Sequence, residues 1–118
     1  MPARLRPAPY AEVRDALAAD PRSAAQTRLL VKHFLALLAE RAPGASVEVR
    51  VPPYAAVQAV PGVRHTRGTP PAVVELDAET WIAVATGELA WDAAESEGRL
   101  RASGERADLS PFLPLEAS

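Results

Sequence analysis

The sequence feature that most constrains the fold is an amphipathic pattern in the segment SAAQTRLLVKHFLALLAERAPG, residues 23–44. Its large apolar residues recur with helical spacing and so share one face of a helix: Leu30, Val31, Phe34, Leu37 and Leu38. Ser23 and Gln26 have the spacing of a capping box, in which each side chain satisfies a backbone N–H of the first turn. Pro43 and Gly44 then predict the end of this helix.

Alternation of apolar and polar residues predicts three strands after the helix. In SVEVRV, residues 46–51, valines alternate with charged residues, which is typical of a strand with one solvated face. Pro52 and Pro53 predict a bend, because proline has no backbone N–H to donate to a neighbouring strand. The segments YAAVQAV, residues 54–60, and AVVEL, residues 72–76, predict the second and third strands.

The last third of the chain predicts two short helices and a fourth strand. Asp77 is expected to cap the helix AETWIAVAT, which ends at Gly87, and the segment LAWDAAESEG predicts a helix that ends at Gly98. In RLRASG, we expect Leu100 and Ala102 to point inward. Together these elements predict an α+β fold with a single mixed sheet that is covered on one face by helices.

Length and charge limit the domain organisation and the partners. The 118 residues suffice for one domain over residues 21–118, preceded by an N-terminal arm over residues 1–20 that can include a short helix. A net charge of −2 argues against binding to nucleic acid. The sequence contains no cysteine, no signal peptide and no apolar run of the roughly 20 residues that span a bilayer. We therefore expect a cytoplasmic protein without integral membrane contact.

No arrangement of residues in the sequence is typical of an active site. No serine lies in a nucleophile elbow, and no glycine-rich phosphate loop is present. Glu105, Arg106 and Asp108 favour a turn with local pairs, in which Asp108 caps the final segment. His33 lies off the apolar stripe of its helix and is expected to face solvent, and neither it nor His65 has a metal-ligand spacing. We therefore expect no enzyme, no metal and no cofactor.

The segment from Glu75 to Asp92 contains both tryptophans of the chain, Trp81 and Trp91. They can line a site for an apolar ligand, or they can pack in an ordinary core. A ligand site measures about 300 Å³ or more, and a dry void of that size costs about 7 kcal/mol. Small domains have about 5–15 kcal/mol of total stability, so both interpretations stay open.

The segment RHTRG is a candidate site for an anion. Arg64, His65 and Arg67 lie in a loop with a glycine, and guanidinium groups bind carboxylates and phosphates through paired hydrogen bonds. The alternative is a solvated loop whose arginines pair with nearby acids and contribute little energy.

From residue 73 onward, the segments VVELD, AETWIAVATGEL, AWDAAESEG and RLRASG resemble the sterol carrier protein-2 domain. VEVRVPPYAAVQAV and RHTRGTPPAVVE are similar to the actinobacterial sterol-carrier-like proteins, and the resemblance covers residues 23–115. In this family the sheet and helices enclose an apolar tunnel for fatty acyl chains, acyl-CoA or sterols, and a C-terminal segment closes one end. The resemblance implies that nine residues line or close such a cavity: Trp81, Val84, Ala85, Trp91, Leu100, Leu109, Phe112, Leu113 and Leu115.

These observations lead us to expect a small non-catalytic module that binds an apolar or amphipathic molecule, with a polar head near RHTRG. The alternative is an accessory domain that buries the same apolar face against a second copy or a helical partner protein. In related proteins a helical module similar to that of mycothiol-dependent isomerases often precedes the domain. A role as a subunit that assists thiol-cofactor chemistry is a third hypothesis, which depends on the resemblance alone.

Overall fold

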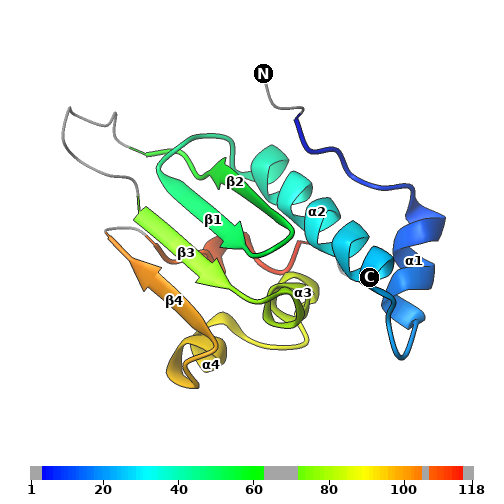
Figure 1. Cartoon of the computed structure of the whole chain (residues 1–118). Coiled ribbons are helices and arrows are strands. Elements are labelled where there is room, and N and C mark those ends of the chain that lie inside the picture. The colour runs from blue at the N-terminus through cyan, green and yellow to red at the C-terminus, as the bar shows by residue number, and fades with distance from the viewer. Residues whose placement is uncertain (1–3, 63–71, 105–106, 116–118) are drawn as a thin grey trace.

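The computed structural model describes residues 4–62, 72–104 and 107–115 (Figure 1). Two helices come first, α1 (Tyr10–Ala18) and α2 (Ala24–Arg41). They are followed by three strands, β1 (Val47–Val51), β2 (Ala55–Ala59) and β3 (Ala72–Leu76). The remaining elements are α3 (Ala78–Thr86), α4 (Trp91–Ser96), β4 (Leu100–Ser103) and the 3-10 helix η1 (Ser110–Phe112). Within the described ranges, no helix has both the length and the hydropathy that crossing a membrane requires.

The strands form one mixed sheet in the order β2-β1-β3-β4. The central pair, β1 and β3, is parallel, and each edge strand is antiparallel to its neighbour. Figure 1 shows the helices and the C-terminal segment on one side of this sheet. The predicted α+β fold with a single mixed sheet is therefore confirmed.

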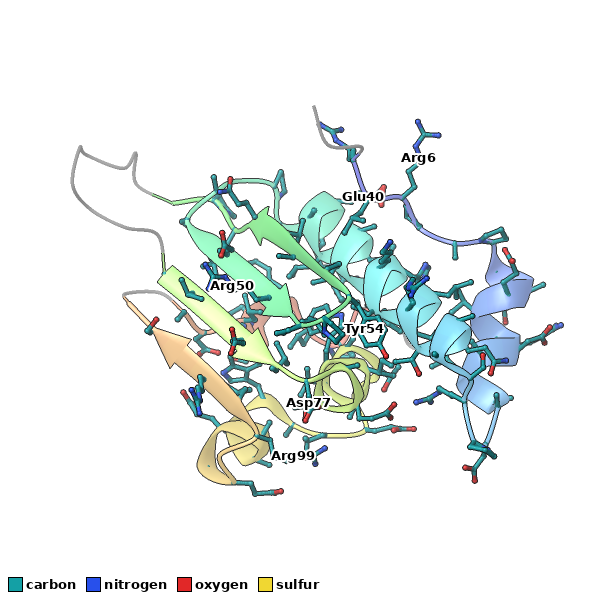
Figure 2. All side chains as sticks on the ribbon, in the orientation of Figure 1. Arg6, Glu40, Arg50, Tyr54, Asp77 and Arg99 are labelled. Carbon is teal, nitrogen blue, oxygen red and sulfur yellow. The ribbon has the colours of Figure 1, made fainter. Side chains whose placement is uncertain are left out.

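The two faces of the sheet differ because side chains alternate along each strand. The inner face carries fully buried valines: Val47, Val49, Val51 and Val74. On the outer face Arg50 pairs with Glu48 and lies opposite Glu75 of the neighbouring strand (Figure 2). This polar outer face explains why helices pack on one side of the sheet only. Ala102, which we predicted to point inward, is exposed, because β4 is an edge strand whose burial ends after Leu100.

Helix α2 is buried on more than one side, which overturns the prediction for His33. The helix contacts β2 and α3 on one side and α1 on another. His33 is only 4% exposed, and its Nδ1 accepts a hydrogen bond from the backbone N–H of Ala8 at 2.9 Å. The apolar stripe identified the face of α2 toward the sheet, but the N-terminal residues cover a second face.

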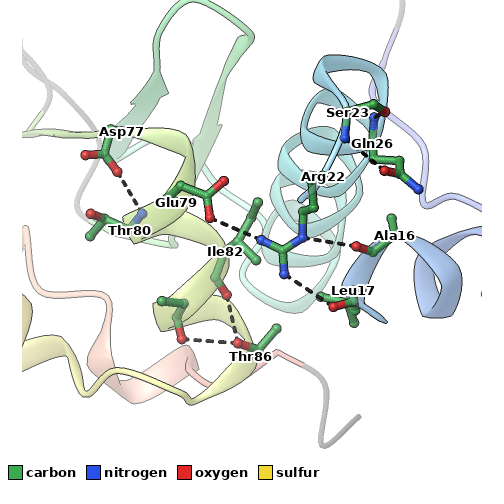
Figure 3. Close-up of polar contacts among 11 residues, drawn as sticks. Ala16, Leu17, Arg22, Ser23, Gln26, Asp77, Glu79, Thr80, Ile82 and Thr86 are labelled. Atoms are coloured by element: carbon green, nitrogen blue, oxygen red, sulfur yellow. Dashed lines mark hydrogen bonds and ion pairs between the residues drawn. The ribbon is translucent and has the colours of Figure 1, made fainter. Parts of the chain in front are cut away.

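Side-chain caps and one arginine hold the helices in place. The predicted capping box of Ser23 and Gln26 is present, and Oδ1 of Asp77 accepts the N–H of Thr80 at 2.7 Å where β3 leads into α3 (Figure 3). Arg22 donates from Nε to the carbonyl oxygen of Ala16 at 3.0 Å and from Nη1 to Glu79 at 3.1 Å (Figure 3). Arg22 thus connects the end of α1 to the first turn of α3.

Candidate ligand-binding cavity

A cavity of about 510 Å³ lies among the end of α3, helix α4 and the C-terminal segment, by which we mean residues 107–115. We call it the α3–α4 cavity. Its apolar part is formed by Val84, Leu89, Trp91, Leu113 and Pro114. Its polar side chains are exposed: Asp92, Glu95, Asp108 and Ser110. The volume falls within the range of about 300–1,000 Å³ that is typical of sites for small molecules.

The turn after α3 shapes one side of the cavity. Gly87 ends the helix with a φ of 87°, a left-handed conformation that glycine adopts without steric cost. The backbone N–H of Leu89 then donates to the carbonyl oxygen of Ala83 at 3.2 Å. A Cβ atom on Gly87 would lie 3.3 Å from Cβ of Pro114, so the C-terminal segment packs closely on this turn. The turn therefore fixes Leu89 and Pro114 in the same wall.

The C-terminal segment is held in place by Arg41, in the last turn of α2. Its Nη1 donates to the carbonyl oxygens of Phe112 at 3.0 Å and Pro114 at 2.8 Å, and its Nη2 donates to that of Leu115 at 3.3 Å. The N–H of Leu115 donates in turn to the carbonyl oxygen of Ala85 at 2.8 Å. Leu109 and Leu115 are buried, so the C-terminal segment docks on the body of the domain through these residues.

The polar edge of the cavity is acidic. Asp92 and Glu95 are three residues apart on α4, a spacing that brings side chains to neighbouring positions on a helix. Asp108 comes from the C-terminal segment, where its Oδ1 accepts the N–H of Ser110 at 2.9 Å. Among the described residues that line the cavity there is no lysine, arginine or histidine.

The two tryptophans have different environments. Trp81 is fully buried, and its indole N–H donates to the carbonyl oxygen of Val31 in α2 at 3.3 Å. It therefore belongs to the core between α2 and α3. Trp91 is 6% exposed and lines the α3–α4 cavity. Because the cavity opens to solvent, the energetic cost of a dry void does not apply to it.

A family model described as a bacterial SCP ortholog matches residues 22–115. The chain belongs to this sterol-carrier-like family. The resemblance noted in the sequence is thereby confirmed, and the matched residues include all those that line the α3–α4 cavity. No curated protein matches the sequence.

In this sterol-carrier-like domain, three of the nine residues expected at a ligand lie together at the α3–α4 cavity: Val84, Trp91 and Leu113. Trp81, Ala85 and Leu109 are fully buried, Leu115 is 5% exposed, and Phe112 is half-buried. Leu100 lines a separate hollow of about 300 Å³ beside Leu76 and Arg99. Arg64, His65 and Arg67 lie outside the described residues. The ligand-binding role of all these residues stays a prediction.

Sequence reasoning missed several residues that shape the cavity. Leu89 and Pro114 line it, and Arg41 positions the C-terminal segment that forms one of its walls. A signal was present for Asp92 and Glu95, whose spacing places two acids on one side of the helix that begins at Trp91. Arg41 carries no such signal, because its hydrogen bonds go to main-chain oxygens. Among the residues that the structure describes, no group of three histidines and acids could hold a metal ion.

Proposed function

We propose that this sterol-carrier-like domain binds an apolar or amphipathic small molecule in the α3–α4 cavity. The observation that carries the proposal is a ligand-sized cavity, within the family-matched part of the chain, whose inner wall is apolar and includes a tryptophan. Val84 and Trp91, which line the cavity, are buried, whereas the acids that line it are exposed. A ligand can therefore bury hydrocarbon and keep a polar end in water.

The driving force is the removal of the hydrocarbon from water. Each Å² of apolar surface buried contributes about 25 cal/mol, so a chain that buries about 200 Å² gains about 5 kcal/mol before the cost of lost freedom. A gain of about 5 kcal/mol corresponds to a Kd of about 0.2 mM, so we expect an affinity of hundreds of micromolar or weaker for such a short chain. The described lining of the cavity supplies a shaped apolar surface with exposed acids beside it, so we propose a carrier or binding module rather than an enzyme.

Titration with three octyl probes tests this proposal: octanol, octanoate and octylammonium. We expect at least one probe to change the tryptophan emission, because Trp91 lines the cavity, and to raise the melting temperature. A ligand at 100 times its Kd stabilises the folded state by about 2.7 kcal/mol. Unchanged emission and an unchanged melting temperature with all three probes would overturn the proposal.

A pair of matched variants locates the site. Leu113→Asp places a charge in the apolar wall and should abolish binding, because Leu113 lines the cavity. Leu17→Asp makes the same change at another half-buried leucine, on α1 and outside the cavity lining, and should leave affinity unchanged. Equal loss in both variants would point to general destabilisation, which circular dichroism would detect.

If no probe binds, the better hypothesis is an accessory domain that buries this face against a partner protein or a second copy. Light scattering after size-exclusion chromatography distinguishes the two. A monomer at all concentrations that binds an octyl probe excludes the second copy, whereas a dimer whose formation is blocked by Leu113→Asp supports it.

A further inference from the structure

We propose that the α3–α4 cavity selects amphiphiles with a cationic polar end, such as an alkylammonium. This inference rests on the proposed function, because it specifies the class of ligand that the same cavity accepts. It departs from the expectation of an anionic head group, which was based on the loop with Arg64 and Arg67.

The apolar residues Val84 and Trp91 that line the cavity are buried, whereas its acidic residues are exposed. Val84 and Trp91 have 1% and 6% exposure. Asp92 and Glu95 are exposed at the edge of the same cavity, one helical turn apart on α4. A bound hydrocarbon chain that lies on the apolar wall therefore has its polar end beside carboxylates.

The carboxylates that line the cavity come from two separate segments of the chain. Asp92 and Glu95 belong to α4, whereas Asp108 belongs to the C-terminal segment, and the cavity lies between them. Asp108 is fixed by the hydrogen bond from Ser110, so its position does not depend on a ligand. A charged group bound between the two segments would feel all three carboxylates at once.

Within the described part of the chain, no cationic side chain pairs with these three carboxylates. The ion pairs formed by described residues involve Glu48, Glu79 and Asp15, and none involves an acid of the cavity. The described residues that line the cavity therefore contribute a negative potential, which attracts a cation and opposes a carboxylate or phosphate.

The size of the effect follows from the exposure of the acids. An exposed ion pair changes an equilibrium by about twofold to fivefold at moderate salt. Three carboxylates together should give octylammonium about tenfold tighter binding than octanol, and octanoate should bind more weakly than octanol by a similar factor. Salt should reduce this preference, because the Debye length is about 8 Å at physiological ionic strength and about 3 Å at 1 M salt.

The test is isothermal titration of the full chain with the three octyl probes at low and high salt. The variant Asp92→Asn with Glu95→Gln removes two cavity carboxylates and should lower the affinity for octylammonium about fivefold while leaving that for octanol unchanged. Asp108 is left intact because it holds the turn at Ser110. The control variant Glu12→Gln with Asp15→Asn makes the same change in net charge at exposed positions of α1, outside the cavity lining. It should bind all three probes like the wild type.

The outcomes separate this inference from the proposed function. Binding of octanol or octanoate as tight as that of octylammonium would overturn the cationic preference and leave the cavity as a ligand site. An equal loss of octylammonium binding in both double variants would also overturn it, because the effect would come from net charge alone. Failure of all three probes to bind would overturn both proposals.

Discussion

Replacement of Arg41 by methionine tests how the C-terminal segment is held against the body. The guanidinium of Arg41 donates three hydrogen bonds to carbonyl oxygens of that segment, at 2.8–3.3 Å. The side chain is exposed, so each bond should contribute about 0.5 kcal/mol, at the low end of the usual range. Methionine has nearly the same helix propensity as arginine, so α2 itself should be unaffected.

We therefore expect Arg41→Met to lower the free energy of unfolding by about 1.5 kcal/mol. For a chain of this length, that corresponds to a fall of about 6 °C in the melting temperature. The amide of Leu115, which donates to the carbonyl oxygen of Ala85, should exchange with solvent about tenfold faster. Octyl probes should bind more weakly, because Leu113 and Pro114 belong to the same segment.

Thermal unfolding and amide exchange measured by NMR provide the assay. Arg41→Lys keeps the charge but not the forked geometry, so it should lie between the wild type and Arg41→Met. Arg28→Met makes the same substitution at an exposed position of the same helix and should change neither measurement. Wild-type stability together with wild-type exchange at Leu115 in Arg41→Met would refute the role of Arg41.

Three further substitutions test the core between α2 and α3, the turn after α3 and the capping box of α2. Trp81→Phe removes the indole hydrogen bond to Val31 from a fully buried site. Urea denaturation should show that the free energy of unfolding falls by about 1–3 kcal/mol, and an unchanged value would contradict a core role for Trp81. Gly87→Ala forces a residue with a side chain to adopt a φ of 87° beside Pro114. The free energy of unfolding should fall by about 1–2 kcal/mol, and the melting temperature by several degrees. An unchanged melting temperature would show that the turn adjusts without strain. Ser23→Ala removes half of the capping box and should cost about 1 kcal/mol by the same denaturation assay, and Ser96→Ala at an exposed position of α4 serves as its control.

The elements of the fold could be predicted from the sequence where one pattern dominated. The apolar stripe and capping box of residues 23–44 identified α2, and the alternating valines before Pro52 identified β1. Burial on a second face could not be predicted in this way. His33 is buried because N-terminal residues cross α2, and that contact between distant parts of the chain leaves no periodic signal around His33.

The cavity was predictable only in part for the same reason. The resemblance to the sterol carrier protein-2 domain implied Val84, Trp91 and Leu113 as lining residues, and these three lie at the cavity. The acidic edge depends on how the C-terminal segment docks, since that docking places Asp108 across from Glu95 at one cavity. Docking depends on main-chain hydrogen bonds from Arg41, which no spacing of residue types reveals.

Intermolecular NOE measurements locate the hydrocarbon part of a bound small molecule, and we expect it in the α3–α4 cavity. The protein is saturated with whichever octyl probe binds most tightly, and contacts from the octyl chain to protein methyl groups are recorded. We predict contacts to the methyl groups of Val84, Leu89 and Leu113, which line the cavity. Contacts to other methyl groups in their place, such as those of Leu17 beside the turn between α1 and α2, would show that the octyl chain binds outside the α3–α4 cavity.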